Sequence, residues 1–320
     1  MLRLIKRHLP DSEIYWWIKS SLAPLLEGDP DLAGVVHFER RRWAAPAQWG
    51  EFWRKVRWLR EQAFDWVIDL QSLARSGAFA WLANGKFTIG LDEPREGARG
   101  FYDLIVPRAS FDTHAVDWYL SVLPFLGVPI VRGFQWLPVR AEPAEKVRQE
   151  LSGKNGRWIV IQPGGRWMNK RWPVEYFADL VRQLAVARGD LRFAILGGDE
   201  DRALGEAIAK ADAERCLDLT GRISLLEMVE WIRACDLMVT NDTGPMHVAA
   251  ALDKPVIALF GPTEPRRTGP YGQLEHTLQL NLPCVPCLKP RCNYVRPLEC
   301  LRAIPPAVVF RAVQKRLGLP

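Results

Sequence analysis

The feature that most constrains the fold of this 320-residue chain is a regular alternation of short apolar runs with longer amphipathic segments. In the second half the apolar runs are 157–161, 192–196, 216–219, 236–240 and 255–260. In the first half they are 13–18, 33–38, 65–70 and 87–90. Alternating strands and helices are typical of a parallel sheet with helices on both faces. We therefore predict an α/β fold.

Two predicted helices carry local signals at their ends. Ser224, followed three residues later by Glu227, predicts a capping box at the start of a helix over 225–234. Gly127 predicts the C-terminal end of a helix over 114–126.

The length favours two domains, because 320 residues exceed what one hydrophobic core covers efficiently. The halves also differ in composition, since 10 of the 14 Trp residues precede residue 140. A segment rich in Pro, Gly and charge over 131–156 marks the junction. We expect an N-terminal domain over 1–140, a C-terminal domain over 155–303 and a closing helix over 304–320.

Composition excludes several classes of protein. No apolar stretch is long enough to span a bilayer, and the N-terminus lacks the features of a signal peptide, so a cytoplasmic chain is expected. The formal net charge of +6 favours an anionic small molecule or an anionic membrane surface over nucleic acid. No dinucleotide fingerprint or P-loop is present, so we expect no cofactor.

Four loops carry the chemistry of the C-terminal half. Each follows a predicted strand and is rich in Gly or small polar residues: Pro163–Gly165, Gly197–Gly198, Asp242–Pro245 and Gly261–Thr263. Ligands of such sheets bind beyond the carboxyl ends of the strands. The loop at Asp242 also opens a helix, whose first amide groups attract anions, and Lys170 adds a positive charge. This combination suits a diphosphate; the alternative is that Gly and Pro only form turns.

These residues resemble a known family. The stretches 162–173, 221–227, 234–251 and 254–265 are similar to the ADP-heptose:lipopolysaccharide heptosyltransferases, glycosyltransferase family 9. The most specific block is Asn241-Asp-Thr-Gly-Pro-Met-His247. The resemblance implies a GT-B fold of two facing Rossmann-like domains. It also implies inverting transfer of heptose from ADP-heptose to a lipid A-Kdo type acceptor or to a heptose of the lipopolysaccharide inner core.

The resemblance further implies roles for individual residues. Contacts to the donor are expected from Gly164, Gly165, Arg166, Lys170, Asp199, Glu200, Asp242, Thr243, Gly244 and His247. Among these, the loop Gly164–Arg166 and Lys170 are expected to contact the diphosphate. Asp199 or Glu200 is expected to bind the ribose. Amide groups and Lys170 would stabilise the leaving ADP without a metal ion. The alternatives are a solvated Lys170 and a His247 that only packs.

The same resemblance places a general base in a Gly-Asp loop between a first strand and a first helix. Here Met1–Asp11 matches the end of that helix. We therefore expect an N-terminal domain that lacks its first strand and helix, with the base encoded upstream of Met1. A degraded gene fragment, or a nucleotide-sugar-binding pseudo-enzyme without turnover, are the alternatives.

A basic and aromatic segment lies at residues 40–60. Its cations are Arg40, Arg41, Arg42, Arg54, Lys55, Arg57 and Arg60, and Trp43, Trp49, Trp53 and Trp58 lie between them. One hypothesis is a surface for a phosphorylated lipid acceptor and anionic headgroups at the inner face of the inner membrane, formed by Arg41, Arg42, Arg54, Lys55 and Arg57. The other is a solvated helix face whose aromatic residues belong to the core.

Four of the six cysteines, Cys284, Cys287, Cys292 and Cys300, lie in the last quarter of the chain. They contain one Cys-x-x-Cys pair but lack the second pair of a zinc ribbon. We expect a structural cluster, either reduced or holding zinc, and no catalytic metal.

Overall fold

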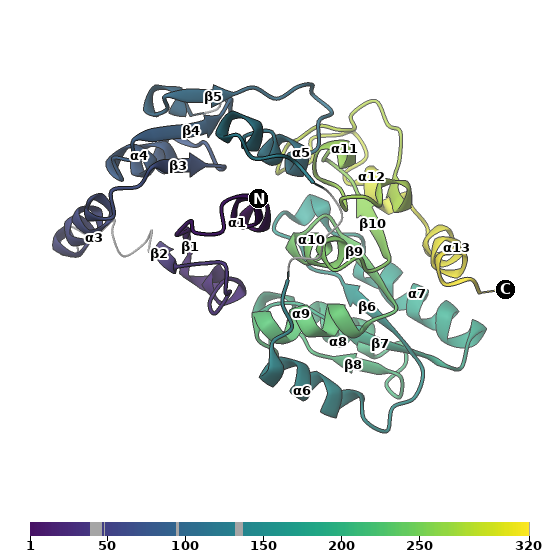
Figure 1. The fold of residues 1–320 in the computed structure, drawn as a ribbon. Helices are drawn as coiled ribbons and strands as arrows, with labels where there is room; N and C mark the ends of the chain where they lie inside the picture. The colour runs from purple at the N-terminus through teal and green to yellow at the C-terminus, as the bar shows by residue number, and fades with distance from the viewer. Residues whose placement is uncertain (39–46, 48, 94–95, 132–136, 320) are drawn as a thin grey trace. The chain divides into compact units, whose positions relative to one another are not determined.

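The computed structural model describes residues 1–38, 47, 49–93, 96–131 and 137–319. The chain forms two compact units, residues 1–133 and 134–320 (Figure 1). No helix in the described part of the chain is long and apolar enough to cross a membrane.

The second unit is built on one sheet of six parallel strands. In chain order these are β6 (Arg157–Gln162), β7 (Leu191–Ile195), β8 (Cys216–Asp218), β9 (Leu237–Asn241), β10 (Val256–Phe260) and β11 (Thr277–Gln279). Their order across the sheet is β11-β10-β9-β6-β7-β8. The order therefore changes direction between β6 and β9, where Gln162 pairs with Thr240.

Helices cover both faces of this sheet because successive strand side chains point to opposite faces. On one face, Ile159 and Val239 belong to a core cluster with α7 (Val174–Ala187) and α13 (Pro306–Leu317). On the other face, Trp158 contacts Trp231 of α9 (Leu225–Ala234), with ring centroids 5.5 Å apart. The predicted α/β fold with parallel strands is confirmed.

The remaining helices of this unit are short apart from the first. They are α6 (Ala141–Leu151), α8 (Arg202–Ala209), α10 (Gly244–Ala251), α11 (Pro265–Thr268) and α12 (Glu299–Arg302), with 3-10 turns at Met168–Lys170, Asp199–Asp201 and Leu274–His276. The capping box of α9 is present as predicted: the Ser224 amide donates to Glu227 Oε2 at 2.6 Å, and the Glu227 amide donates to Ser224 Oγ at 3.2 Å.

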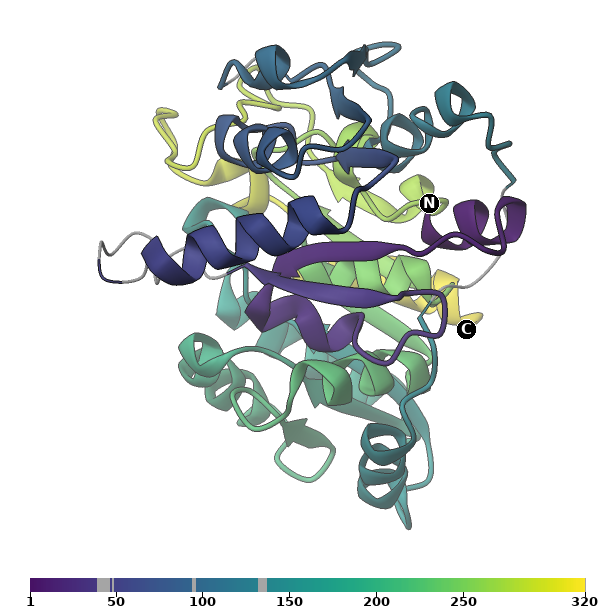
Figure 2. The ribbon, with the colours of Figure 1, turned by 60° about the vertical axis from the view of Figure 1, so that its left-hand side comes forward.

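The first unit has two small parallel sheets. One pairs β1 (Tyr15–Lys19) with β2 (Gly34–Phe38), side by side in Figure 2. The other has the order β3 (Trp66–Asp69), β4 (Phe87–Leu91) and β5 (Leu104–Val106). Its helices are α1 (Leu2–His8), α3 (Trp49–Glu61), α4 (Ala74–Leu82) and α5 (Ala115–Leu120), with 3-10 turns at Ser20–Leu25, Ala98–Phe101 and Leu123–Leu126.

Within the described residues no strand joins β1 to β3, so a single Rossmann-like sheet is not formed in this unit. The two sheets are connected by side-chain contacts between their strands and helices. Trp17 of β1 contacts Phe79 of α4, with ring centroids 4.9 Å apart. Ile5 of α1 packs in a cluster that includes Ile68 of β3.

One sequence expectation about a helix differs from the structure. The helix expected over 114–126 ends at Leu120 and continues as a 3-10 turn, because Pro124 has no amide hydrogen and disfavours helical backbone before it. Gly127 still ends this segment, with a positive φ of 72°. Strand β1 is half-buried. Within the second unit, Leu137 O accepts from Arg233 of α9, and the Arg140 amide donates to Glu230 of α9.

Candidate functional site

The candidate site lies at the carboxyl edge of the second unit's sheet, where the strand order changes direction. In open α/β sheets the crevice at such a point is the usual ligand site. Four adjacent strands, β10, β9, β6 and β7, lead into the four loops singled out by sequence. The sheet therefore brings together loops that are far apart in the chain.

Asn241, the last residue of β9, joins two of these loops. Its side chain is fully buried. The Nδ2 group donates to Pro163 O at 2.7 Å, and Oδ1 accepts from the Trp172 amide at 3.0 Å. Sequence reasoning gave Asn241 no role. Its position directly before Asp242 was the sequence feature that could have indicated a role in the site.

A cation and an acid meet at the centre of the site. Lys170 Nζ lies 2.6 Å from Asp242 Oδ2, and Thr263 Oγ1 donates to the same oxygen at 2.6 Å. Asp242 is buried, whereas Lys170 keeps 17% of its side chain exposed and lies 4.9 Å from the centre of the Trp167 ring. The ammonium group is thus fixed by an acid on one side while part of it still reaches solvent.

Helix α10 begins beside this pair. Its N-cap residue is Thr243, which has extended backbone and makes no side-chain capping bond. Gly244 follows, and a Cβ built on it would meet nothing within 4 Å. This helix start faces open space. Pro245 has no amide hydrogen and the Met246 amide donates to Thr243 O at 3.2 Å, so the helix offers an anion the Gly244 amide and the positive end of its dipole.

The loop after β6 requires glycine at one position. A Cβ on Gly164 would lie 2.1 Å from Asp201 Oδ2. Asp201 is buried, and its Oδ1 accepts no hydrogen bond among the described residues, although Arg171 Nη2 lies 3.5 Å away. Burial raises the pKa of the Asp201 carboxyl, and Arg171 opposes this rise. Arg171 also donates from Nε to Gly165 O at 2.8 Å, so it links both sides of the loop.

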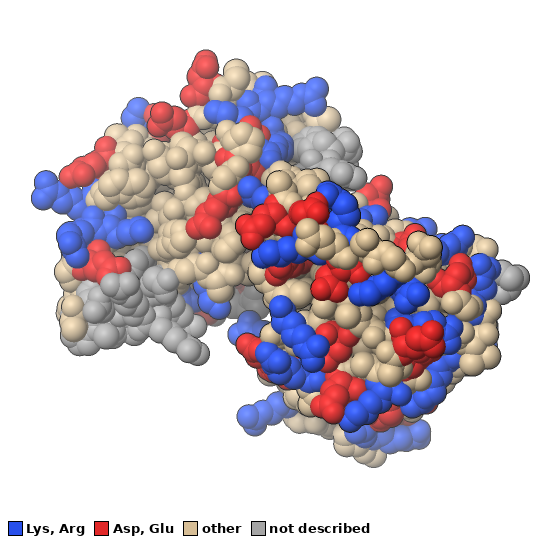
Figure 3. Space-filling view, turned by 90° about the horizontal axis from the view of Figure 1, so that it is seen from below, with Lys and Arg blue, Asp and Glu red and all other residues tan. Residues whose placement is uncertain are grey.

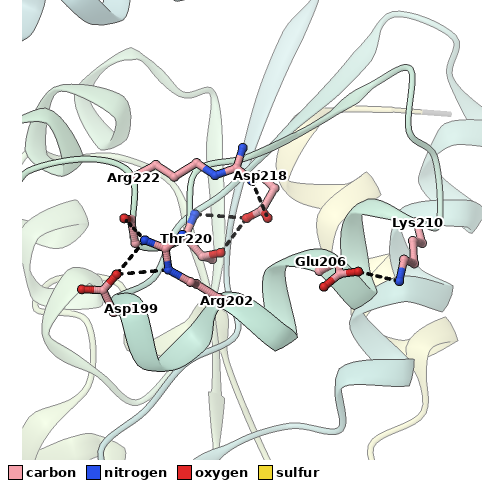
Figure 4. A network of polar contacts seen from close by, with 8 residues as sticks. Asp199, Arg202, Glu206, Lys210, Asp218, Thr220 and Arg222 are labelled. Carbon is pink, nitrogen blue, oxygen red and sulfur yellow. Dashed lines mark hydrogen bonds and ion pairs between the residues drawn. The ribbon is translucent and has the colours of Figure 1, made fainter.

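The two acids expected to bind ribose lie in the 3-10 turn Asp199–Asp201, directly after Gly197–Gly198. Figure 4 shows Asp199 turned toward Arg202, whose Nη2 donates to Asp199 Oδ1 at 2.8 Å and to Gly221 O at 2.7 Å. Asp199 and Glu200 are both exposed. The acid that packs against the Gly164 loop is their neighbour Asp201. Sequence reasoning did not select it among the three consecutive acids.

The remaining expected donor residues lie at the margin of the site. Arg166 is exposed in the loop after Gly165, and His247 is exposed in the first turn of α10. The structure thus brings Gly164, Gly165, Lys170, Asp242, Thr243 and Gly244 to one edge of the sheet.

The basic and aromatic segment is described in part. Residues 40–46, which include Arg40, Arg41, Arg42 and Trp43, lie outside the described residues. Arg54, Lys55 and Arg57 lie on α3, where only Val56 and Leu59 are fully buried. Trp49 and Trp53 are each 56% exposed, so they do not belong to the core.

The six cysteines carry no disulfide. Within the described ranges, no group of three or more His, Cys, Asp or Glu side chains is placed to hold a metal ion. Cys300 is buried in α12, and burial together with the neighbouring thiols raises its pKa to about 11. Cys292 Sγ accepts from the Leu298 amide at 3.3 Å.

Comparisons with known proteins show which family the sequence resembles. A family model described as glycosyltransferase family 9 (heptosyltransferase) matches residues 52–296. Lipopolysaccharide heptosyltransferase 1 of Pseudomonas aeruginosa is 31% identical over 304 residues, which cover 90% of this chain and 81% of the relative. Lipopolysaccharide heptosyltransferase 2 of Salmonella typhimurium is 28% identical over 301 residues, which cover 88% and 83%.

Two solved structures have a similar fold. The ADP-heptose lipopolysaccharide heptosyltransferase II of E. coli has a TM-score of 0.77 at 22% identity, covering 99% of this chain and 93% of that one. The E. coli heptosyltransferase WaaC, solved with ADP, has a TM-score of 0.73 at 23% identity, covering 98% and 93%.

Proposed function

The chain belongs to glycosyltransferase family 9, the heptosyltransferases, and on this premise we propose that it transfers heptose from ADP-heptose to the inner core of lipopolysaccharide. The acceptor in this proposal is a Kdo or heptose residue carried on lipid A. The enzyme would work at the inner face of the inner membrane. One observation carries the proposal: Lys170, Asp242 and the open start of α10 meet at the point where the strand order changes direction.

The chemistry follows from charge. An acceptor hydroxyl attacks the anomeric carbon in line, the bond to the diphosphate breaks, and the configuration inverts. ADP leaves with growing negative charge. The Lys170 ammonium, held by Asp242, and the Gly244 amide at the start of α10 would stabilise that charge in a fixed geometry.

The acids after β7 have different roles in this proposal. Asp199, which pairs with Arg202, and Glu200 are exposed and are proposed to reach the ribose, whereas Asp201 packs directly against Gly164. We propose that Asp201 and Arg171 shape the loop that receives the nucleotide. Arg166 and His247 are proposed to contact the donor from the rim of the site, where both side chains are exposed.

A Lys170→Met variant tests the role of the cation. The substitution removes the ammonium group proposed to face the diphosphate. We therefore expect the transfer rate from ADP-heptose to fall by about 10²–10³-fold. Lys210→Met is the matched control, because Lys210 is exposed and pairs with Glu206 on α8. An unchanged kcat/KM in Lys170→Met would remove the lysine from the mechanism.

The enzyme and the non-catalytic alternative differ in turnover. The full chain is incubated with ADP-heptose and a Kdo-lipid A acceptor, and ADP binding is measured in parallel. Binding with transfer supports the proposed reaction, whereas binding without transfer supports a nucleotide-sugar-binding protein. Titration with UDP- and GDP-sugars tests which nucleobase the donor carries. Tighter binding of either sugar nucleotide would contradict ADP-heptose as the donor.

A further inference from the structure

We propose that one face of α3, together with the hollow between α3 and β2, docks the enzyme on an anionic phospholipid bilayer. The inference deepens the proposed function and rests on it in one respect, since a lipid-carried acceptor is met at a membrane surface. The proposed contact with the bilayer is made by described residues of the first unit, none of which belongs to the donor site.

The aromatic part of this surface is a strip along α3. Trp49, Trp53 and Arg57 are spaced by four residues, so they lie on one side of the helix. Both indole rings are more than half exposed. The buried residues Val56 and Leu59 lie on the neighbouring side of α3, since Val56 is seven residues from Trp49. Large aromatic side chains beside cations are favoured at the interface between headgroups and acyl chains.

The same helix extends this strip toward α4. Arg60 donates from Nε to Leu82 O at 3.2 Å, so the ends of α3 and α4 lie together. Trp81, one residue before that contact on α4, is 57% exposed. Among the described residues, Trp49, Trp53 and Trp58 of α3 and Trp81 of α4 are thus exposed aromatic side chains on two neighbouring helices.

The cationic part is a hollow of about 470 Å³. Its floor and walls are apolar, from Val35 and Val36 of β2 and Trp58 of α3, and Tyr15 packs against Trp58 with ring centroids 5.7 Å apart. Arg54 and Lys55 line it with their charged side chains. An apolar hollow edged by two cations suits the phosphate and glycerol of a lipid headgroup.

The charges of the hollow are available to an anion. In the part of the chain that the structure describes, neither Arg54 nor Lys55 has an acidic partner. Glu51 also lines the hollow and brings one negative charge beside the two cations. Exposed cations elsewhere in both units pair with a nearby acid, as Arg57 does with Glu61 on α3 itself and Lys210 with Glu206 on α8. Figure 3 shows positive and negative side chains intermixed on the face that it draws.

Vesicle co-sedimentation of the full chain tests the proposal. The vesicles are phosphatidylcholine, with or without anionic phosphatidylglycerol. We expect binding to the anionic vesicles that weakens as salt rises, because the phosphate contacts are screened. Arg54→Gln with Lys55→Gln should weaken binding roughly 25-fold, at about fivefold for each cation. Trp49→Ala with Trp53→Ala should weaken it by roughly tenfold or more.

The matched control is Arg182→Gln with Lys210→Gln, which removes the same charge from the second unit. Binding that falls equally in this control, or that survives in both α3 variants, overturns the proposal. Equal binding to vesicles without phosphatidylglycerol, or full competition by inorganic phosphate at matched ionic strength, also overturns it.

The two proposals fail in different ways. All α3 variants are assayed in parallel for ADP binding, which uses only the second unit. Lost vesicle binding with retained ADP binding supports the docking surface. Vesicle binding without any heptose transfer leaves the docking surface supported while the proposed reaction fails.

Discussion

At the residue scale, the site depends on buried polar side chains that hold its loops. Asp242 accepts from Lys170 and Thr263, and Asn241 holds the Pro163 carbonyl. Asp201 differs, because its Oδ1 atom is buried without a hydrogen bond among the described residues, as are Gln162 Oε1 and Asn169 Oδ1. A buried carboxylate that lacks a donor costs free energy when it is charged.

Asp201 therefore makes stability depend on pH in a defined direction. Its folded pKa is raised by burial, so the folded protein holds this proton at a pH where the unfolded chain has released it. The contribution of Asp201 to the free energy of unfolding should fall as pH rises from the ordinary value of 3.8 through the folded pKa.

Urea unfolding of the wild type and Asp201→Asn between about pH 4 and pH 7 measures this effect. The difference, wild type minus variant, should decrease as pH rises, because asparagine does not titrate. A difference that is constant or increases with pH would contradict the raised pKa.

At the element scale, strands position the loops and helix starts supply the local donors. The ends of β6 and β9 are adjacent because Gln162 pairs with Thr240. Helix α10 starts without a side-chain cap, which leaves its start open to a ligand. Helix α9 starts with a complete capping box and serves the fold instead. The unpaired amide groups at a helix start are thus capped by side chains in α9 and left open to a ligand in α10.

Ser224→Ala should lower the free energy of unfolding by about 1 kcal/mol, because the Glu227 amide loses its acceptor. The contribution of Glu227 itself is lost as pH falls, since the Ser224 amide lowers the pKa of this carboxyl. Denaturant unfolding of Ser224→Ala and the control Ser224→Thr measures the loss. An equal loss in both variants would show that capping is not its cause.

At the scale of the whole molecule, the two units have separate tasks in the proposed function. Every polar contact of the donor site described above comes from residues 134–320, and the proposed membrane surface lies within residues 1–133. Donor binding is therefore expected to protect one unit more than the other.

Hydrogen exchange of the full chain with saturating ADP measures this separation. We expect the strongest slowing in peptides covering 162–172 and 240–248, because ADP would stabilise the folded form of these loops. Peptides from α3 should show no comparable change. Equal slowing throughout residues 1–133, or none near Lys170, would contradict the assigned donor site.

Much of the fold and part of the site could be predicted from sequence. The apolar runs become strands because their side chains are buried on one or both faces, and Gly127 and Ser224 act locally as predicted. The loops of the site were found because their residue types suit strand ends. The ribose contact expected from Asp199 or Glu200 stays a prediction, and sequence could not single out Asp201, because only packing against Gly164 distinguishes it from the other two.

The sequence by itself determined the α/β alternation, the helix ends and the family, because each depends on local spacing or on a short run of residue types. Only the tertiary structure decided which loops are neighbours, which acid meets Lys170 and which tryptophans stay exposed. These features depend on strand order and on burial, which arise between segments far apart in the chain. Strand order aligns Asp242 with Lys170 across 72 residues, a relation that local sequence does not encode.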